Sequence, residues 1–294
     1  MKELLDRYIS SLTIGGMTQH KNLAVTSLLL KEQSERDYLV LEEALGSGLK
    51  IGELKNASVQ EVDVANETGH DILIVLGEYL IGGGQNRQAA SSIFLAKEYR
   101  GKIPVQCIQH GRWDPTPGKR FEYGGYSTPS ARSESRRGQS AVWQSVNETT
   151  TRTHIFSQTQ NLDEVYEKQK GTLEEYVSKF SFSPNQVGII AVIGLNGKKM
   201  FVADIFDSSK TFERHYSALI KAHALEALGR PVDKVSASKD EIRDFLTEFI
   251  RANPGQTKEI SLGTDYKLTS KTGSEGTTLI NANKVRYASM TRVI

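Results

Sequence analysis

Hydrogen-bond donors gather in two short segments of the sequence, each directly after an apolar run. The first segment, residues 77–87, is rich in glycine and ends in Gln85, Asn86 and Arg87; the second ends in Arg112 and Trp113. Glycine lets backbone amides approach a ligand closely, and a guanidinium presents a fork of donors that matches phosphate or carboxylate. A core does not need such residues at strand ends, so the two segments together predict a binding site.

The glycine-rich segment has two interpretations. Its amides and Arg87 could form an anion-binding turn around residues 82–87, or the segment could be a structural bulge with polar residues at the surface. No Gly-Lys-Ser/Thr follows, and the glycine spacing is not that of a dinucleotide-binding turn. The succession of Gln, Asn and Arg favours the ligand hypothesis.

Glu78 is the candidate catalytic residue. It follows residues 72–76, a run that is apolar on both faces and is therefore expected to be buried. A carboxylate at the end of such a strand would be partly desolvated, which would raise its pKa and suit general acid–base chemistry. The alternative is an ion pair with Arg87 or Arg112 that orients the arginine.

Arg112 and Trp113 combine a fork of donors with an aromatic plate, which suits a phosphate beside a stacked base or sugar. The alternative is a tryptophan that covers the end of the core, with Arg112 packed over it. Other candidate ligand contacts are Gln109 beside this segment and Arg132 in the following Ser/Arg-rich run. Arg132 could equally be a solvated charge in a mobile segment.

Nucleophile and metal chemistry have little support. Cys107 shares one strand face with Ile103 and Val105, since side chains alternate along a strand, and this predicts an inert buried thiol. His215 and His223 are eight residues apart on a predicted helix and diverge by about 80° around its axis. No zinc motif and no nucleophile elbow is present, so no metal site is predicted; the sequence identifies no particular cofactor and leaves that question open.

The composition is that of an ordinary globular protein. The 294 residues include 38% hydrophobic and 24% charged residues, and the net charge of +2 argues against a protein that coats nucleic acid. A single cysteine excludes an intrachain disulfide, no apolar run could span a membrane, and the N-terminal residues do not resemble a signal peptide. The expected location is the cytoplasm.

The first hundred residues are expected to form mostly antiparallel sheet with short loops. A short amphipathic helix is predicted at 2–12, a strand at 23–30 and a helix at 41–45. A strand containing Val62 and Val64 is expected to pair with 71–76 across the turn signal at 66–69. Residues 93–96 and 103–108 are expected to repeat that pattern.

Residues 114–153 are rich in Pro, Gly, Ser and Arg and are expected to be irregular, either a disordered loop or a functional lid. The second half then alternates. The predicted helices cover 162–180, 209–228 and 239–252, the last opened by a capping box at Ser238 and Glu241. A hairpin is predicted at 187–205 around Asn196-Gly197, and two short strands near 258–262 and 284–290. The fold class is α+β, with a mostly antiparallel N-terminal half and a mixed C-terminal half.

An ordered set of motifs in this chain resembles the ARPP family, the ARG- and rhodanese-phosphatase-superfamily-associated protein domain. The set lies between about residues 23 and 228, and it defines an ARPP-like domain over 1–230 followed by a helix-plus-strand extension over 231–294. The matching motifs are Gly77-Glu78-x-Leu80-x-Gly82-x-x-Gln85-Asn86-Arg87, Pro104-Val105-x-Cys107-x-x-x-Gly111-Arg112-Trp113, and then Gln139 and Trp143.

The family name records a gene association with ADP-ribosylglycohydrolases and phosphatases, so the resemblance implies NAD metabolism and an ADP-ribose-like ligand. Two departures matter. Gln109 stands where members usually carry Glu, which weakens a case for two-carboxylate chemistry. Gly83-Gly84 stand where members commonly have Ala-Lys, so one potential phosphate cation is absent.

Two hypotheses follow. In the first, the protein binds, and could process, an ADP-ribose- or nucleotide-like phosphorylated metabolite. In that hypothesis Arg87 and Arg112 hold phosphate, Gln85 and Asn86 bond to sugar or base, Trp113 stacks, and Glu78 acts as base or ribose ligand. In the second, a non-catalytic protein docks a partner through the 114–153 segment. Nucleic-acid binding is the least favoured interpretation, because the arginines are scattered and the net charge is near zero.

Overall fold

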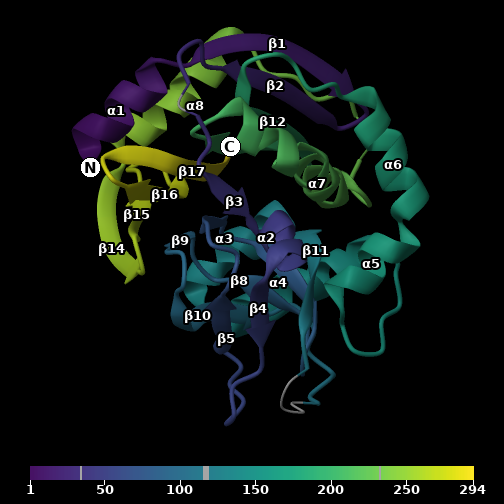
Figure 1. The fold of residues 1–294 in the computed structure, drawn as a ribbon. Coiled ribbons are helices and arrows are strands. Elements are labelled where there is room, and N and C mark those ends of the chain that lie inside the picture. Colours follow the sequence, from purple (N-terminus) through teal and green to yellow (C-terminus); the bar gives the residue numbers. More distant parts are fainter. Residues whose placement is uncertain (34, 115–118, 232) are drawn as a thin grey trace. The chain divides into compact units, whose positions relative to one another are not determined.

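The computed structural model describes residues 1–33, 35–114, 119–231 and 233–294. The chain divides into two compact units (Figure 1). The first unit comprises Met1–Arg36, Glu174–Glu259 and Gly263–Ile294, and the second comprises Asp37–Leu173 and Ile260–Leu262. The predicted α+β class is confirmed. Residues 115–118 of the segment expected to be irregular lie outside the described residues.

The first unit is built on an eight-stranded sheet with the order β1-β2-β12-β13-β17-β16-β15-β14. The predicted hairpin at Asn196-Gly197 joins β12 and β13, the third and fourth strands in this order, and β12 is buried over most of its length because both faces are covered. The strands are β1 (Thr13–His20), β2 (Leu23–Leu29), β12 (Gln186–Leu195), β13 (Lys198–Phe206), β14 (Asn253–Ile260), β15 (Gly263–Thr269), β16 (Glu275–Asn281) and β17 (Lys284–Val293).

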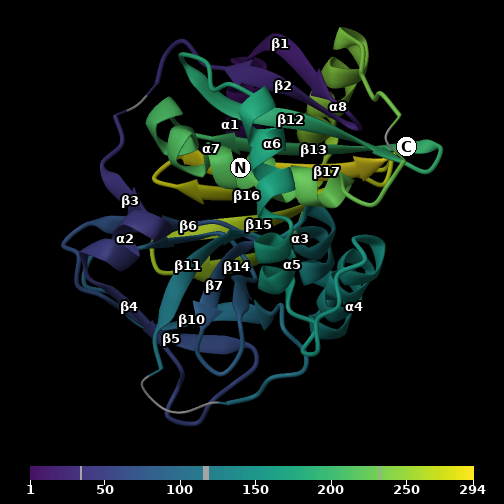
Figure 2. The same cartoon turned by 90° about the vertical axis from the view of Figure 1, so that its right-hand side faces the viewer.

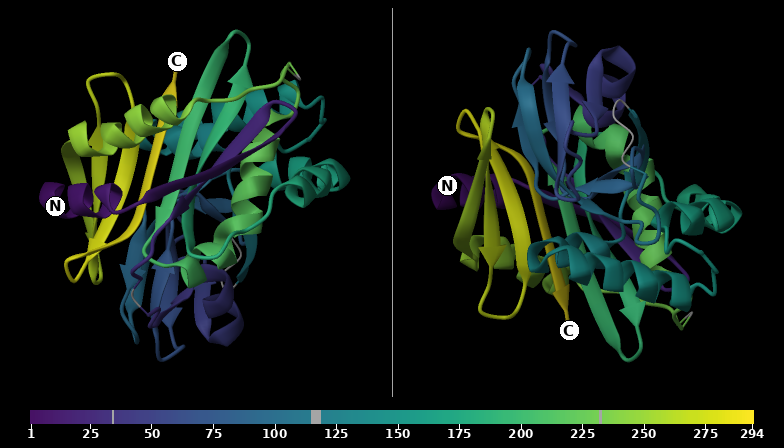
Figure 3. Two further views of the ribbon diagram at one scale, coloured as in Figure 1. Left: turned by 90° about the horizontal axis from the view of Figure 1, so that it is seen from above. Right: turned by 90° about the horizontal axis from the view of Figure 1, so that it is seen from below.

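Helices cover both faces of this sheet. α1 (Lys2–Ser10) and α8 (Lys239–Arg251) share one core with the face that carries Phe201 and Ala203. In the left view of Figure 3 the purple N-terminal helix and the yellow-green helix lie side by side over the yellow strands. α7 (Ser209–Ala227) lies on the other face, where its His223 meets Asp204, the residue after Ala203. Side chains alternate across a strand, so one strand serves both layers.

The second unit is a small barrel. Its main sheet has the order β11-β7-β8-β10-β5-β4, and Figure 2 shows β4, β5, β7, β10 and β11 of this sheet. A bridge between Gly52 at the end of β4 and Arg120, directly before β11, joins the two edges of the sheet. A second sheet has the order β3-β6-β9. The strands are β3 (Tyr38–Val40), β4 (Leu49–Gly52), β5 (Glu61–Asn66), β6 (Asp71–Ile74), β7 (Glu78–Gly82), β8 (Arg87–Ala89), β9 (Ile93–Leu95), β10 (Arg100–Cys107) and β11 (Phe121–Tyr126).

The expected strand pairings within this unit are wrong. β5 pairs with β10 and β4, whereas β6 pairs with β9 and, in parallel, with β3. The turn at 66–69 does form, with Thr68 N donating to Asn66 Oδ1 at 3.1 Å. However, the Asn66 amide also donates to Ala96 O, which ties this turn to the end of β9 and directs the chain into the other sheet. A turn signal fixes a reversal of the chain but not the partner of the strand that follows.

The segment expected to be irregular contains regular structure. After β11 come α3 (Pro129–Glu134), a 3-10 turn (Ser135–Arg137) and α4 (Gln139–Arg152). Thr128 caps α3, Pro129 occupies its first turn, and Val142 and Val146 bury one side of α4. Because the segment is mostly polar, the narrow apolar face of α4 was not recognised from the sequence.

Three other boundaries differ from those expected. The helix at 162–180 is split at Gln169 into α5 (Leu162–Lys168) and α6 (Lys170–Lys179). The C-terminal region has four strands where two were expected. The chain does not divide at residue 230, because β17 pairs with β13 and the residues after 231 complete the first sheet.

Among the described residues, no helix combines the length and apolar character needed to cross a membrane.

Candidate functional site

The glycine-rich loop between β7 and β8 is held by bonds from its own amides. Gly82 N donates to Asn86 Oδ1 at 3.0 Å, Gly83 N to Arg120 O at 3.3 Å and Gly84 N to Glu53 Oε1 at 2.7 Å. Gly82 and Gly83 have φ values of 116° and 51°, in the left-handed region that favours glycine. These three amides therefore stabilise the turn, and an anion would have to displace their protein acceptors.

Arg112 closes this loop from the second donor-rich segment. Its guanidinium donates to Gly83 O and Gly82 O, both at 3.1 Å, and to Asn86 Oδ1 at 3.2 Å. Its Nε donates to Gln109 Oε1 at 2.9 Å. The two segments singled out in the sequence thus converge, and the donors of Arg112 are bonded to acceptors of the protein itself.

Arg87 is completely buried inside the end of the barrel. It lies opposite both Leu80 and Cys107 in the sheet, so its side chain shares the inner face. Its Nη2 is 3.3 Å from Glu53 Oε1, and the guanidinium also donates to the backbone carbonyls of residues 58 and 59. The ring of Trp113, which is 48% exposed, lies 5.5 Å from the Arg87 guanidinium carbon. Trp113 therefore stacks over Arg87 at the end of the barrel.

Gln85 occupies the same loop. Its amide Nε2 donates to His110 O at 3.3 Å, while its side-chain oxygen is buried without a hydrogen bond from the described residues. Gln109, in the second donor-rich segment, also bonds outside the loop: its Nε2 donates to Thr159 Oγ1 at 2.9 Å. Both amides therefore link the loop to neighbouring backbone and side chains.

Glu78 begins β7, at the opposite end of the strand from the loop. Four residues at the rise of a strand separate it from Gly82 by about 13 Å. Its carboxyl group is completely buried and accepts a hydrogen bond from Val75 N at 2.6 Å. Burial raises the pKa of Glu78 well above its usual value, and the charge of Glu42 acts in the same direction. The buried arginine of the loop pairs with Glu53 rather than with Glu78.

Arg132 packs against Gly77, the residue that precedes Glu78 in the chain. A Cβ atom on Gly77 would stand 2.2 Å from both Cγ and Cδ of Arg132, and Gly77 has a φ of 85°. Arg132 is only 4% exposed, and its guanidinium carbon lies 5.7 Å from the ring of Tyr126. We call Gly77, Glu78, Tyr126 and Arg132 the Gly77 cluster. Glycine is required here both for the backbone conformation and for the close approach of Arg132.

Two residues of α5 extend this cluster and were missed in the sequence. Tyr166 donates to Tyr126 O at 2.6 Å and stacks on Tyr79 with ring centroids 5.8 Å apart. Tyr79 donates to Asp163 Oδ1 at 3.1 Å, and burial raises the pKa of Asp163. Their spacing of three residues places Asp163 and Tyr166 on one side of the helix, which was the only available signal.

Cys107 is buried as predicted. Burial raises the pKa of its thiol to about 11, although the neighbouring Arg87 guanidinium, which contacts the sulfur, acts in the opposite direction. In the part of the chain that the structure describes, no group of three or more His, Cys, Asp or Glu side chains could hold a metal ion.

Comparison with protein families gives a match to the ARG and Rhodanese-Phosphatase-superfamily-associated Protein domain. It covers residues 11–291 and so includes the C-terminal strands that the motifs in the sequence did not reach. Comparisons with curated proteins and with solved structures gave no match. Since the match spans nearly the whole chain, this protein belongs to the ARG and Rhodanese-Phosphatase-superfamily-associated Protein domain family.

Proposed function

We propose that the protein binds a phosphorylated metabolite of the nucleotide or ADP-ribose type at the Gly77 cluster. One observation carries the proposal: the ionisable side chains of Glu78 and Arg132 are both buried, and Arg132 packs against Gly77, the residue before Glu78, whose missing Cβ admits the arginine. Burying ionisable groups is costly, and such groups concentrate at functional sites.

The cluster has chemistry that suits this ligand. A guanidinium forms paired, charge-assisted hydrogen bonds with phosphate, and Arg132 already lies over the ring of Tyr126. Because its pKa is raised, the Glu78 carboxyl group keeps its proton to higher pH and could donate to a ribose hydroxyl or act as a general acid. If the ligand is processed, Glu78 is the residue that we expect to move the proton.

The residues of the glycine-rich loop have a positioning role in this proposal. The donors of Asn86, Arg87 and Arg112 are bonded to protein acceptors, so they hold the loop and the barrel end rather than the phosphate. The ring of Trp113 stacks over Arg87 at the same end of the barrel and shares this positioning role. The single buried cysteine fits a cytoplasmic location.

Calorimetric titration with ADP-ribose, NAD, AMP and a phosphosugar tests this proposal. We expect one of them to bind the wild-type chain, and Arg132→Ala to weaken that binding at least tenfold, while Arg132→Lys restores part of it. Arg137→Ala is the matched control, because Arg137 lies on the same segment but is exposed and paired with Glu134. Absence of heat with all four compounds, or equal binding by Arg132→Ala, would contradict the proposal.

A second candidate is a non-catalytic protein that docks a partner. Its supporting observation is Phe156, whose side chain is 82% exposed after α4. Phe156→Asp should abolish retention of a partner in pull-downs, while Arg132→Ala leaves it unchanged.

A further inference from the structure

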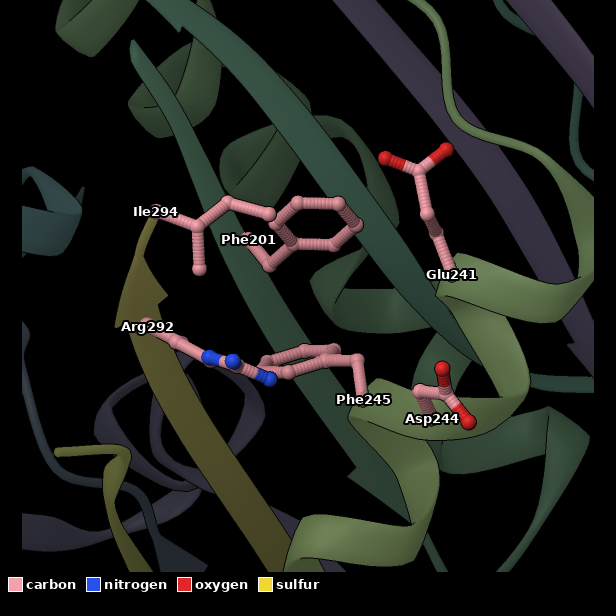
Figure 4. A pocket seen from close by; sticks show the side chains of 6 residues that line it. All are labelled: Phe201, Glu241, Asp244, Phe245, Arg292 and Ile294. Carbon is pink, nitrogen blue, oxygen red and sulfur yellow. The ribbon is translucent and has the colours of Figure 1, made fainter. Parts of the chain in front are cut away.

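The first unit has a pocket of about 140 Å³ between α8 and the strands β13 and β17 (Figure 4). Phe201 and Arg292 are direct partners in these strands, so both side chains project from one face of the sheet toward α8. The volume is close to that of engineered cavities that hold benzene. The lining residues are Phe201, Glu241, Asp244, Phe245, Arg292 and Ile294.

Two aromatic rings give the pocket an apolar surface. Phe201 and Phe245 are buried, with ring centroids 5.4 Å apart and planes inclined by 50°. Their neighbours in the pocket are charged, and Figure 4 shows Arg292 approaching from the strand while Glu241 and Asp244 approach from the helix. A ligand there would meet opposite charges beside an apolar surface.

Arg292 offers an unused donor. Its Nε atom is buried, and the described residues provide neither a hydrogen bond nor an ion pair for its guanidinium. Its charge does act on Glu248, where burial opposes ionisation but hydroxyl groups of residues 270, 272 and 274, together with Arg292, lower the pKa. A buried donor without an acceptor destabilises the fold, and a bound acceptor would relieve that cost.

Asp244 offers an unused carboxylate. The other acidic residue, Glu241, already accepts from Lys199 Nζ at 2.9 Å and from Ser238 N at 2.7 Å. Asp244 is exposed and has no hydrogen bond or ion pair with any residue that the structure describes. Among the described residues that line the pocket, Asp244 and Arg292 are therefore the charged groups that remain open to a ligand.

We propose that this pocket binds a small zwitterion with an apolar body, such as an amino acid. Its carboxylate would accept from Arg292, its ammonium group would donate to Asp244, and its apolar part would lie against Phe201 and Phe245. The proposal is independent of the Gly77 cluster, because it uses only residues of the first unit.

Calorimetric titration of the full chain with L-leucine and 6-aminohexanoate, which carry both charges, provides the test. Hexanoate and hexylamine carry one charge each. We expect at least one zwitterion to bind at least tenfold more tightly than both single-charge compounds. Lack of binding by both zwitterions at millimolar concentration would overturn the proposal, as would equal binding by a single-charge compound.

Variants identify the pocket as the site. Asp244→Asn and Arg292→Gln should each weaken binding of the zwitterion at least tenfold, while Asp240→Asn should leave it unchanged. Asp240 is the matched control because it is an exposed carboxylate on the same helix, paired with Arg243. Since Asp244 is exposed, Asp244→Asn is expected to fold even if Arg292→Gln does not. Unchanged binding by Asp244→Asn would overturn the proposal.

Discussion

The guanidinium of Arg87 lies 3.3 Å from the carboxylate of Glu53, and neither side chain is exposed to solvent. The two residues come from separate parts of the barrel and meet where the glycine-rich loop turns. Glu53 also accepts from Gly84 N, so one carboxylate fixes both the arginine and the loop. The most distinctive sequence segment of this protein is thus anchored by a buried ion pair.

Removing the acidic partner should be strongly destabilising. Glu53→Gln leaves the Arg87 charge buried without compensation, and we expect the free energy of unfolding to fall by about 3–5 kcal/mol. Chemical denaturation measures this loss. Glu61→Gln is the control, because Glu61 pairs with Lys102 at the surface, where solvent limits the loss to less than about 1 kcal/mol. Equal losses in the two variants would contradict a structural role for the buried pair.

Gly77→Ala should destabilise the second unit more than an ordinary turn substitution. The alanine Cβ would strain a left-handed residue, at a cost of about 1–2 kcal/mol, and would also collide with Arg132. Gly69→Ala separates the two effects, since Gly69 has a φ of 76° and open space around it. Thermal unfolding should therefore show a larger fall in Tm for Gly77→Ala; equal falls would mean that Arg132 moves aside at little cost.

The buried Glu78 should make stability depend on pH. Because its pKa is raised in the folded state, the folded chain holds a proton that the unfolded chain releases above about pH 4.3. The stabilisation that protonated Glu78 provides, measured as the difference in free energy of unfolding from Glu78→Gln, should therefore be complete below that pH. Above it, this difference should fall by about 1.4 kcal/mol per pH unit until the folded carboxyl group ionises. Denaturation of both proteins between pH 4 and pH 8 measures the difference, and a constant difference would show that Glu78 has an ordinary pKa.

The thiol of Cys107 should be protected in the native protein. With a pKa of about 11 and no exposed surface, it is almost entirely protonated at pH 8 and inaccessible to reagents. We expect iodoacetamide to label it only after unfolding in guanidinium, as detected by mass spectrometry. Rapid labelling of the native chain would indicate that the end of the barrel under Trp113 opens readily.

Local patterns in the sequence predicted the elements whose signals are themselves local. α1 and α7, the capping box of α8 and the hairpin at Asn196-Gly197 all form as predicted. The buried environments of Glu78 and Cys107 also followed from the apolar runs before or around them. Each of these features depends on residues within a few positions of one another, so its cause is visible in a short stretch of chain.

The tertiary structure decided the partners. The sequence could not show that Glu53 pairs with Arg87, that Arg132 crosses Gly77, or that the Gly52–Arg120 bridge joins the edges of the barrel. These contacts join residues far apart in the chain, and their free energy depends on which strands are adjacent and which side chains are buried together. Candidate residues could therefore be recognised in the sequence, whereas the contacts between them arise only when the whole chain folds.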